Sequence, residues 1–439
     1  MSKKVTIFTT FTGADQAYSL NRVTQDQIKM LLLNGYEPTV ITAEGFKPIE
    51  MYAHPKVTIK NIPNVPVSNE ARMDNTFNQD IRRLEGALTE ILKDTDICIT
   101  HDIIYQAAAL KHQIAAKRVA KVYPKLRWLH WIHSATPPAR LADMTQHFAD
   151  EFAKEIRNKF PNSFLVYFNS WFIPAVAKSF DVEQNEVKLV PHATDFCRFK
   201  KYEKNTIKLV RAKDMLSADA IAVYPVRLDR GKQVQYVIEV MAMLKTLEKS
   251  VRVIIADFHS TGGDKVTYRD ELKKMAAQWG LNEQEITFTS EFLPEWHLEV
   301  PYQVIGDLMD LANTFIFPSC SESYSLITQE SGLSRQAQVL NFNLTPLMGI
   351  FGPHPYYKKF GEAAVDPFNN EDPGTMKTEY QNERMYMLDV ARLINYELET
   401  NRILAQERFL RRHRNLNAVF KKYIEPLFAY EPKEEVKSQ

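Results

Sequence analysis

Short apolar runs alternate with amphipathic stretches along most of the chain. The runs are rich in β-branched residues and predict buried strands, whereas the stretches between them have the 3.6-residue spacing of helices. In the first half the predicted strands are Val5–Thr9, Pro38–Thr42, Asp96–Thr100, Arg127–His133, Ser163–Asn169 and Lys188–Pro191, and the predicted helices are Gln25–Asn34, Asp80–Lys93 and Ala107–Val122. This strand–helix–strand repetition predicts a parallel sheet with helices on both faces.

The alternation restarts after a polar stretch rich in Lys and Glu, Phe199–Lys208, which we expect to connect two domains. The predicted strands there are Ile221–Val226, Val251–Ala256, Ile286–Thr289 and Thr314–Phe317, and the predicted helices are Val234–Thr246, Tyr268–Trp279, Ile305–Ala312 and much of Arg384–Phe428. The chain is therefore predicted to be an α/β protein with two doubly wound, Rossmann-like domains in series. Such sheets bind ligands at the carboxyl ends of their strands.

Composition narrows the function classes. A length of 439 residues suits two domains, and 45% hydrophobic with 25% charged residues is typical of a soluble globular protein. The net charge of +1 argues against a DNA-packing protein. The cysteines Cys98, Cys197 and Cys320 lack the spacing of metal ligands, and no apolar window is long enough to span a membrane. We therefore expect a cytoplasmic protein without a metal.

The stretch FPSCSESYSLITQE, Phe317–Glu330, carries the most chemistry. A strand ends at Phe317, a polar loop follows, and a helix begins near Ser325. Glu322 lies in the loop and Glu330 within the helix, so two carboxylates flank a helix start whose backbone N–H groups can bind a phosphate. The alternative interpretation is an exposed loop acid and a solvated helix face.

A second stretch, PVRLDRGKQ at Pro225–Gln233, also follows a predicted strand. Arg227 and Lys232 stand at the strand end and the helix entry, where two cations can neutralise a diphosphate. A solvated basic turn is the alternative.

Taken together and in this order, the two stretches resemble the retaining GT-B glycosyltransferases of glycosyltransferase family 4. The resemblance is carried by R-x4-K at Arg227 and Lys232, by FPS followed by E-x7-E at Glu322 and Glu330, and by the helix-like segment YRDELKKMAAQWGL between them. It implies a GT-B fold with two Rossmann-like domains facing across a cleft. We place the acceptor-side domain at residues 1–200, the donor domain at 201–405, and C-terminal helices that cross back to the first domain at 406–439.

The family pattern also implies roles for the matching residues. Arg227 and Lys232 would hold the donor diphosphate, Glu330 the ribose hydroxyls, and Glu322 the transferred sugar. Backbone amides around Tyr324, Ser325 and Leu326 would meet phosphate or sugar oxygens. The co-substrate would be UDP-sugar or another nucleotide sugar, with no further cofactor. Because the departing phosphate is thought to help deprotonate the acceptor, no protein nucleophile is expected.

Acceptor-side candidates lie in the first half of the chain. His101 and Asp102 follow one predicted strand, and His133 ends another. In related enzymes a histidine at the position resembling His133 reaches the sugar, so we count it with Glu322, Arg227 and Lys232 as catalytic; a buried structural histidine is the alternative. Gly13 is the only glycine in a loop where many family members carry paired glycines.

The acceptor itself stays open at the sequence level. A glycan or lipid-linked sugar is one class, and a hydroxymethylated base of phage-type DNA is another. Six cations and no acid in Lys111–Arg127 offer a docking surface for DNA or an anionic membrane, or else a solvated helix face. A nucleotide-sugar epimerase, a sugar phosphorylase and a non-catalytic binding protein remain further alternatives.

Overall fold

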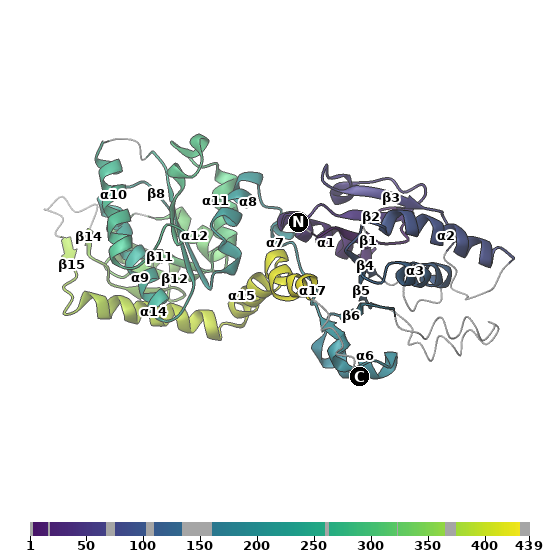
Figure 1. Cartoon of the computed structure of the whole chain (residues 1–439). Helices are drawn as coiled ribbons and strands as arrows, with labels where there is room; N and C mark the ends of the chain where they lie inside the picture. The colour runs from purple at the N-terminus through teal and green to yellow at the C-terminus, as the bar shows by residue number, and fades with distance from the viewer. Residues whose placement is uncertain are drawn as a thin grey trace. The chain divides into compact units, whose positions relative to one another are not determined.

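The computed structural model describes residues 3–15, 18–66, 75–101, 109–133, 160–259, 263–322, 324–364 and 375–430. The chain divides into two compact units, each with its own sheet (Figure 1). Unit 1 comprises Met1–Asp195 and Arg414–Gln439, and unit 2 comprises Phe196–His413.

In unit 1 the described residues form a seven-stranded sheet in the order β3-β2-β1-β4-β5-β6-β7, with every neighbouring pair parallel. Strands β1, β4 and β5 are buried at nearly every position, as expected when helices cover both faces of a parallel sheet. The strands are β1 (Val5–Phe8), β2 (Thr39–Ala43), β3 (Thr58–Ile62), β4 (Ile97–His101), β5 (Arg127–Trp131), β6 (Ser163–Tyr167) and β7 (Val187–Leu189).

Two hydrophobic clusters cover the two faces of this sheet. Successive strand residues point to opposite faces, so Cys98 and Trp128 join the cluster under α2, α3 and α6, whereas Ile99 and Leu129 join the one under α1. The helical elements are α1 (Ser19–Leu33), η1 (Glu50–Ala53), α2 (Phe77–Leu92), α3 (Leu110–Val122), η3 (Ser170–Phe172), α6 (Ile173–Phe180), η4 (Gln184–Glu186), α16 (Leu416–Val419), η9 (Phe420–Ile424) and α17 (Glu425–Ala429).

Unit 2 contains a second parallel sheet, whose described strands follow the order β10-β9-β8-β11-β12-β13. These strands are β8 (Ala220–Val226), β9 (Val251–Asp257), β10 (Ile286–Phe288), β11 (Thr314–Phe317), β12 (Ala337–Asn341) and β13 (Tyr356–Lys358). A short antiparallel pair, β14 (Glu362–Ala364) and β15 (Thr375–Lys377), follows. In both sheets the strand order runs outward from the first strand and then resumes on its other side, with β4 beside β1 and β11 beside β8, which is the doubly wound pattern.

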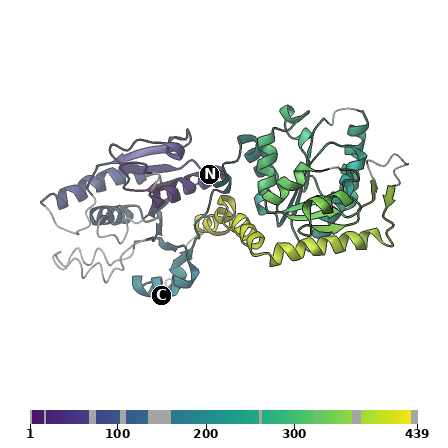
Figure 2. The same cartoon turned by 180° about the vertical axis from the view of Figure 1, so that it is seen from behind.

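Helices cover both faces of the unit 2 sheet (Figures 1 and 2). Helices α9, α10 and α14 pack together on one face, and α8, α11 and α12 on the other. The helical elements are α7 (Phe196–Lys200), α8 (Lys204–Ala212), η5 (Met215–Ser217), η6 (Arg230–Lys232), α9 (Val234–Thr246), α10 (Gly263–Gln278), η7 (Thr289–Glu291), η8 (Pro294–Trp296), α11 (Tyr302–Leu311), α12 (Leu326–Leu333), α13 (Thr345–Phe351), α14 (Glu383–Thr400) and α15 (Arg402–His413).

The prediction of two doubly wound α/β sheets is confirmed. The stretch Phe199–Lys208, expected to be a polar connection, is instead mostly helical and lies in unit 2. Its polar residues have structural partners: Glu203 caps α8 by accepting hydrogen bonds from the Asn205 and Thr206 amides, and Lys200 pairs with Asp310. The polar residues Glu203 and Lys200 of this stretch therefore cap a helix and form an ion pair.

The C-terminal helices divide between the units. In α15 the guanidinium of Arg411 is fully buried and donates to the carbonyls of Met215 and Ala218, which ties this helix to unit 2. From Arg414 onward the chain belongs to unit 1, where Phe420 and Phe428 join the cluster under α1. Within the described ranges, no helix combines the length and apolarity needed to cross a membrane.

Candidate functional site

The two sequence motifs of unit 2 meet at the carboxyl ends of neighbouring strands. The loop after β8 and the loop after β11 touch where the Cys320 amide donates to the Gly231 carbonyl over 2.8 Å. A Cβ atom added at Gly231 would lie 3.0 Å from Cys320 Sγ, so a side chain there would require the Cys320 side chain to shift. Residues about 90 positions apart in sequence are thereby brought to one edge of the sheet.

An ion pair joins the two loops at their centre. The Lys232 ammonium contacts Glu322 Oε1, and Ser319 Oγ donates to the same oxygen over 3.2 Å. Both charged side chains are largely covered, with 23% of Lys232 and 21% of Glu322 exposed. Lysine has three N–H donors, so its contact with Glu322 leaves it able to bind an additional anionic oxygen. The arrangement thus holds a cation and a hydrogen-bond acceptor side by side at the sheet edge.

Gln233, a residue not predicted from sequence, ties these loops to the start of β14. Its side-chain amide donates to the carbonyls of Pro318 and Glu362, and its Oε1 accepts from the Glu362 amide over 2.9 Å. Gln233 has φ = +51° and Gly361 has φ = +46°. A Cβ atom at Gly361 would stand 1.9 Å from Gln233 Oε1, so only glycine fits. These contacts of Gln233 with Pro318 and Glu362, which we call the Gln233 clamp, hold the residue that directly follows Lys232.

Asn341, at the end of β12, supports the same loop from beneath and was also not predicted. Its amide group donates to the carbonyls of Pro318, Ser319 and Phe360, and its Oδ1 accepts from the Phe360 and Asn343 amides. Because Asn341 is fully buried, each of these bonds would be costly to break. The backbone around Ser319 and Glu322 is therefore held rigidly before any ligand binds.

Helix α12 begins directly after this loop. Ser325 precedes it with φ = +72°, and its hydroxyl is 2.9 Å from that of Thr328. Tyr324 and Leu326 are exposed. The first N–H groups of a helix have no intrahelical acceptor, so this end can offer donors to an anion next to Lys232.

Glu330 and Arg227 are held by partners of their own. Tyr302 of α11 donates its hydroxyl to Glu330 Oε1 over 2.9 Å, and this bond to a carboxylate raises the pKa of Tyr302 above its usual value. Arg227 is 56% exposed, and its Nε lies 3.5 Å from Asp229 of the same loop. Arg227 and Glu330 both lie on the predicted stretches. Their side chains pair with Asp229 and Tyr302 rather than with Lys232 or Glu322.

A second cluster lies at the carboxyl edge of the unit 1 sheet. His101 ends β4 and His133 follows β5, and their ring nitrogens Nδ1 and Nε2 are 3.1 Å apart. His192, after β7, stacks on His133 with ring centres 5.2 Å apart, and Phe168, after β6, stacks on His192 at 4.8 Å. His192 and Phe168 were not predicted as site residues; standing within three residues of a strand end is the signal that identifies them.

His101 is buried and hydrogen-bonded to Gln27 of α1, another residue not predicted. Burial and the neighbouring rings of His133 and His192 hold the pKa of His101 well below its usual value. His101 is therefore a neutral imidazole at physiological pH.

Gly13 and Asp102 are the two other residues that the sequence predicts on the acceptor side. The carbonyl of Gly13 accepts from the Asn21 amide group over 3.4 Å, and a Cβ atom there would meet nothing within 4 Å, so its backbone does not require glycine. Asp102 lies outside the described residues.

Most of the cations that the docking interpretation of Lys111–Arg127 would use are buried or paired. Lys117 is buried with its ammonium 5.3 Å from the centre of the Phe160 ring, and Lys111 pairs with Asp80 at 2.9 Å. Arg127 is also buried, and donates to the Leu427 carbonyl. Lys111, Lys117 and Arg127 therefore serve the core and its ion pairs, whereas Lys121 and Lys125 are exposed. This pattern favours the interpretation without a docking surface for DNA or an anionic membrane.

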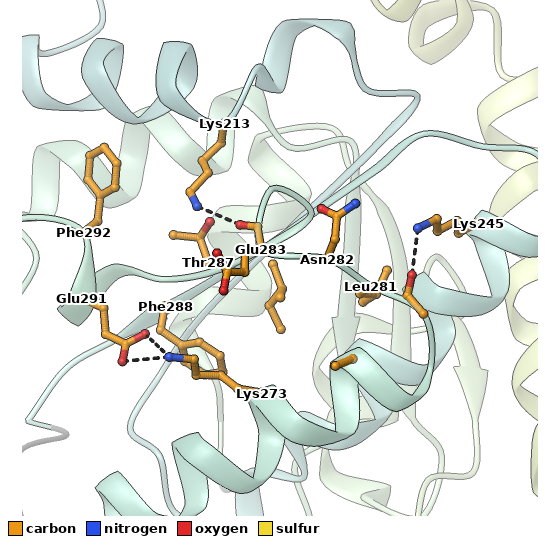
Figure 3. Close-up of a pocket in the computed structure, with 13 residues that line it drawn as sticks. Lys213, Lys245, Lys273, Leu281, Asn282, Glu283, Thr287, Phe288, Glu291 and Phe292 are labelled. Carbon is orange, nitrogen blue, oxygen red and sulfur yellow. Dashed lines mark hydrogen bonds and ion pairs between the residues drawn. The ribbon is translucent and has the colours of Figure 1, made fainter.

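A separate hollow of about 750 Å³ lies along β10, the edge strand of the unit 2 sheet (Figure 3). Its lysines have local partners: Lys273 binds both carboxylate oxygens of Glu291, and Lys213 donates to the Glu283 backbone carbonyl. Among the described residues, its lining includes none that the sequence predicts for the site. Nor do the described His, Cys, Asp and Glu side chains form a group of three or more suited to a metal ion.

Comparison with solved structures finds distant likenesses over nearly the full chain. A glycosyltransferase from Rickettsia africae is 13% identical with a TM-score of 0.35, covering 97% of this chain and 98% of that one. Anabaena HepE, solved with UDP, is 13% identical with a TM-score of 0.35, covering 97% and 100%. The N-terminal domain of Candida albicans trehalose-6-phosphate phosphatase is 11% identical with a TM-score of 0.38, covering 98% and 97%.

At such identities and TM-scores these likenesses assign no chemistry to the chain. No family model matches it, and no curated protein matches it either.

Proposed function

We propose that the chain is a retaining GT-B glycosyltransferase that moves a sugar from a nucleoside-diphosphate donor to an acceptor hydroxyl. The observation that carries this proposal is the convergence of Lys232 and Glu322 from two distant motifs at adjacent strand ends. The cation and the helix start at this sheet edge match the diphosphate of such a donor, and the carboxylate beside them matches its sugar.

In this proposal the donor binds to unit 2. Lys232, Arg227 and the first amides of α12 hold the diphosphate, and Glu322 accepts hydrogen bonds from the sugar hydroxyls. Glu330, oriented by Tyr302, accepts from the ribose hydroxyls. Donors aimed at the leaving diphosphate stabilise the charge that grows there in the transition state, which is commonly the largest catalytic contribution. The loop is preorganised by Gln233 and Asn341, so little reorganisation accompanies binding.

The bond changes balance without a protein nucleophile. The bond from the anomeric carbon to the diphosphate oxygen breaks, and a bond from the same carbon to the acceptor oxygen forms on the same face. The acceptor proton passes to the departing phosphate. We assign the acceptor to unit 1, at the edge that carries His101 and His133.

The acceptor we favour is a glycan or lipid-linked sugar. The rival acceptor, a modified DNA base, rested on the Lys111–Arg127 stretch, whose central cations are buried or paired.

Donor affinity of a matched pair of lysine variants tests the proposal. Lys249 pairs with Glu399 in the same unit and is 20% exposed, so Lys249→Ala removes a comparable cation away from the site loops. Lys232→Ala should weaken nucleotide-sugar binding about 10- to 100-fold, because a charge-assisted hydrogen bond contributes roughly 1.5–3 kcal/mol, whereas Lys249→Ala should leave it unchanged. Equal affinities of both variants for the nucleotide sugar, measured by titration calorimetry, would show that the diphosphate does not bind at Lys232.

A further inference from the structure

The exposed face of α12 places apolar side chains on both sides of a carboxylate. Leu326 lies four residues before Glu330 and Leu333 three residues after it, so all three share one face of the helix. Leu326 is 68% and Leu333 is 84% exposed, although the exposed face of a helix is usually polar. This face therefore suits a ligand that carries both hydroxyls and an apolar part.

Tyr302 of α11 adds an aromatic ring beside the same carboxylate. Its hydroxyl donates to Glu330 Oε1 over 2.9 Å, and this bond raises the pKa of Tyr302 above its usual value, so the ring is uncharged at neutral pH. Tyr302 is 75% exposed, which leaves much of the ring open to a ligand. Because the hydroxyl is anchored, a planar ligand would meet a ring that is already oriented.

The spacing along α12 suits a nucleoside diphosphate. The helix begins at Leu326, where its first N–H groups are the proposed diphosphate donors, and Glu330 follows about 6 Å along the helix axis. In a nucleoside diphosphate only the ribose ring separates the diphosphate from the ribose hydroxyls, and the base is joined to the carbon next to the 2′-hydroxyl. A ribose bound to Glu330 would therefore bring its base within reach of the Tyr302 ring, whose hydroxyl contacts that carboxylate.

We propose that the base of the donor nucleotide stacks on the Tyr302 ring while its ribose hydroxyls bind Glu330. The ribose contact rests on the proposed function, and the stacking surface goes beyond it. Every base has a π face, so the ring adds affinity for a nucleoside diphosphate relative to pyrophosphate without selecting one base. Burial under a base also gives the exposed ring an apolar partner in the bound state.

Titration calorimetry on the full-length protein, with nucleoside diphosphates and with inorganic pyrophosphate, tests the stacking. Tyr302→Phe keeps the ring and Tyr302→Leu removes it, while both lack the hydroxyl, so their difference isolates the ring. Whichever of UDP, ADP and GDP the wild type binds should bind about 5- to 150-fold more weakly to Tyr302→Leu than to Tyr302→Phe, as expected for a base on an aromatic side chain. Pyrophosphate, which has no base, should bind both variants equally. Equal nucleotide affinities of the two variants would overturn the proposal.

Tyr396→Leu is the matched control. Tyr396 is 59% exposed on α14, which covers the other face of the unit 2 sheet from α11, so nucleotide affinity should stay unchanged. Sedimentation velocity tests a different occupant of the exposed side chains, a second copy of the chain. A wild-type dimer that dissociates in Tyr302→Leu, with equal nucleotide affinities of Tyr302→Phe and Tyr302→Leu, would assign the ring to an interface between copies and overturn the proposal.

Lys232→Ala separates this inference from the proposed function. Weaker nucleotide binding in Lys232→Ala, with equal binding by Tyr302→Phe and Tyr302→Leu, would overturn the stacking and leave the donor site supported. The expected difference between the two Tyr302 variants, without sugar transfer by the wild type from any donor, would support the stacking and refute the glycosyltransferase proposal. Wild-type protein that binds no nucleotide would overturn both.

Discussion

Single residues with unusual backbone conformations hold the site loops of unit 2 in place. Gln233, Ser325 and Gly361 all have positive φ, and Gln233 and Gly361 are in direct contact. The sequence singles out Lys232 and Glu322 through their two motifs and the family resemblance, and in the structure these two side chains pair. Gln233 and Asn341 were not predictable, because the role of a buried amide depends on which carbonyls the fold brings to it.

Replacing Gly361 by alanine should loosen this clamp. The new Cβ atom would overlap Gln233 Oε1, and alanine is strained at φ = +46°. We expect a loss of about 2–4 kcal/mol in the free energy of unfolding, together with weaker nucleotide-sugar binding. Urea denaturation measures the first effect and calorimetric titration the second.

Gly306→Ala in α11 is the control, because the added Cβ meets nothing within 4 Å and lies inside a helix. It should be neutral or stabilise the protein by up to about 1 kcal/mol. Equal effects of the two substitutions would mean that the clamp has no role.

At the scale of elements, the sequence predicts buried apolar helices and strands well but misses a polar strand at the edge of a sheet. The helix Val234–Thr246 and the strand Thr314–Phe317 have the predicted bounds, because both are almost wholly buried and apolar. Strand β3 was missed: it is an edge strand whose residues are mostly exposed, so its sequence, TIKNI, lacks a buried run. Sequence also places His101 and His133 at strand ends but cannot place α1 beside them.

The packing of α9 against α14 predicts a pH dependence of stability. Glu239 of α9 is buried, no described residue donates to its Oε2, and burial with the nearby charge of Glu383 raises its pKa to about 8. The folded state then binds more protons than the unfolded state between about pH 4.5 and 8, so stability should fall as the pH rises through this window. Glu239→Gln should remove roughly 3–5 kcal/mol of this fall, as measured by urea denaturation at pH 5 and 8.

The pH dependence of stability that Glu399 contributes should have the opposite sign to that of Glu239. Hydrogen bonds from Arg408 and Lys249 lower its pKa to about 2, so its contribution is present above the unfolded value and lost in acid. Glu399→Gln should therefore destabilise the protein at pH 8 and have no effect near pH 2. Parallel pH profiles for Glu239→Gln and Glu399→Gln would contradict both assignments.

At the scale of the whole molecule, unit 1 depends on residues from both ends of the chain. The segment after Arg414 packs Phe420 and Phe428 beside Tyr36 of the N-terminal part. The sequence predicts helices in this segment, and the family resemblance implies that residues 406–439 cross back to the first domain. The contacts of Phe420 and Phe428 show where the segment packs, and the part that joins unit 1 begins at Arg414.

Phe420→Ala should destabilise unit 1 selectively. Removing a fully buried phenylalanine costs about 3–5 kcal/mol, so hydrogen exchange should accelerate in β1 and β4 while β8 and β9 keep their protection. Phe199→Ala removes an exposed phenylalanine and should change neither. Faster exchange confined to unit 2 would contradict the assignment of the C-terminal segment.

Nucleotide release from a panel of nucleotide sugars, with wild type and Glu322→Gln compared, tests the central claim most directly. Each donor is offered with and without candidate glycan acceptors and with duplex DNA carrying hydroxymethylated bases. The account predicts release from a single class of donor, stimulated by a hydroxylated glycan acceptor and strongly reduced in Glu322→Gln. Release stimulated by the modified DNA alone would contradict the favoured acceptor, and no release from any donor would contradict the glycosyltransferase assignment itself.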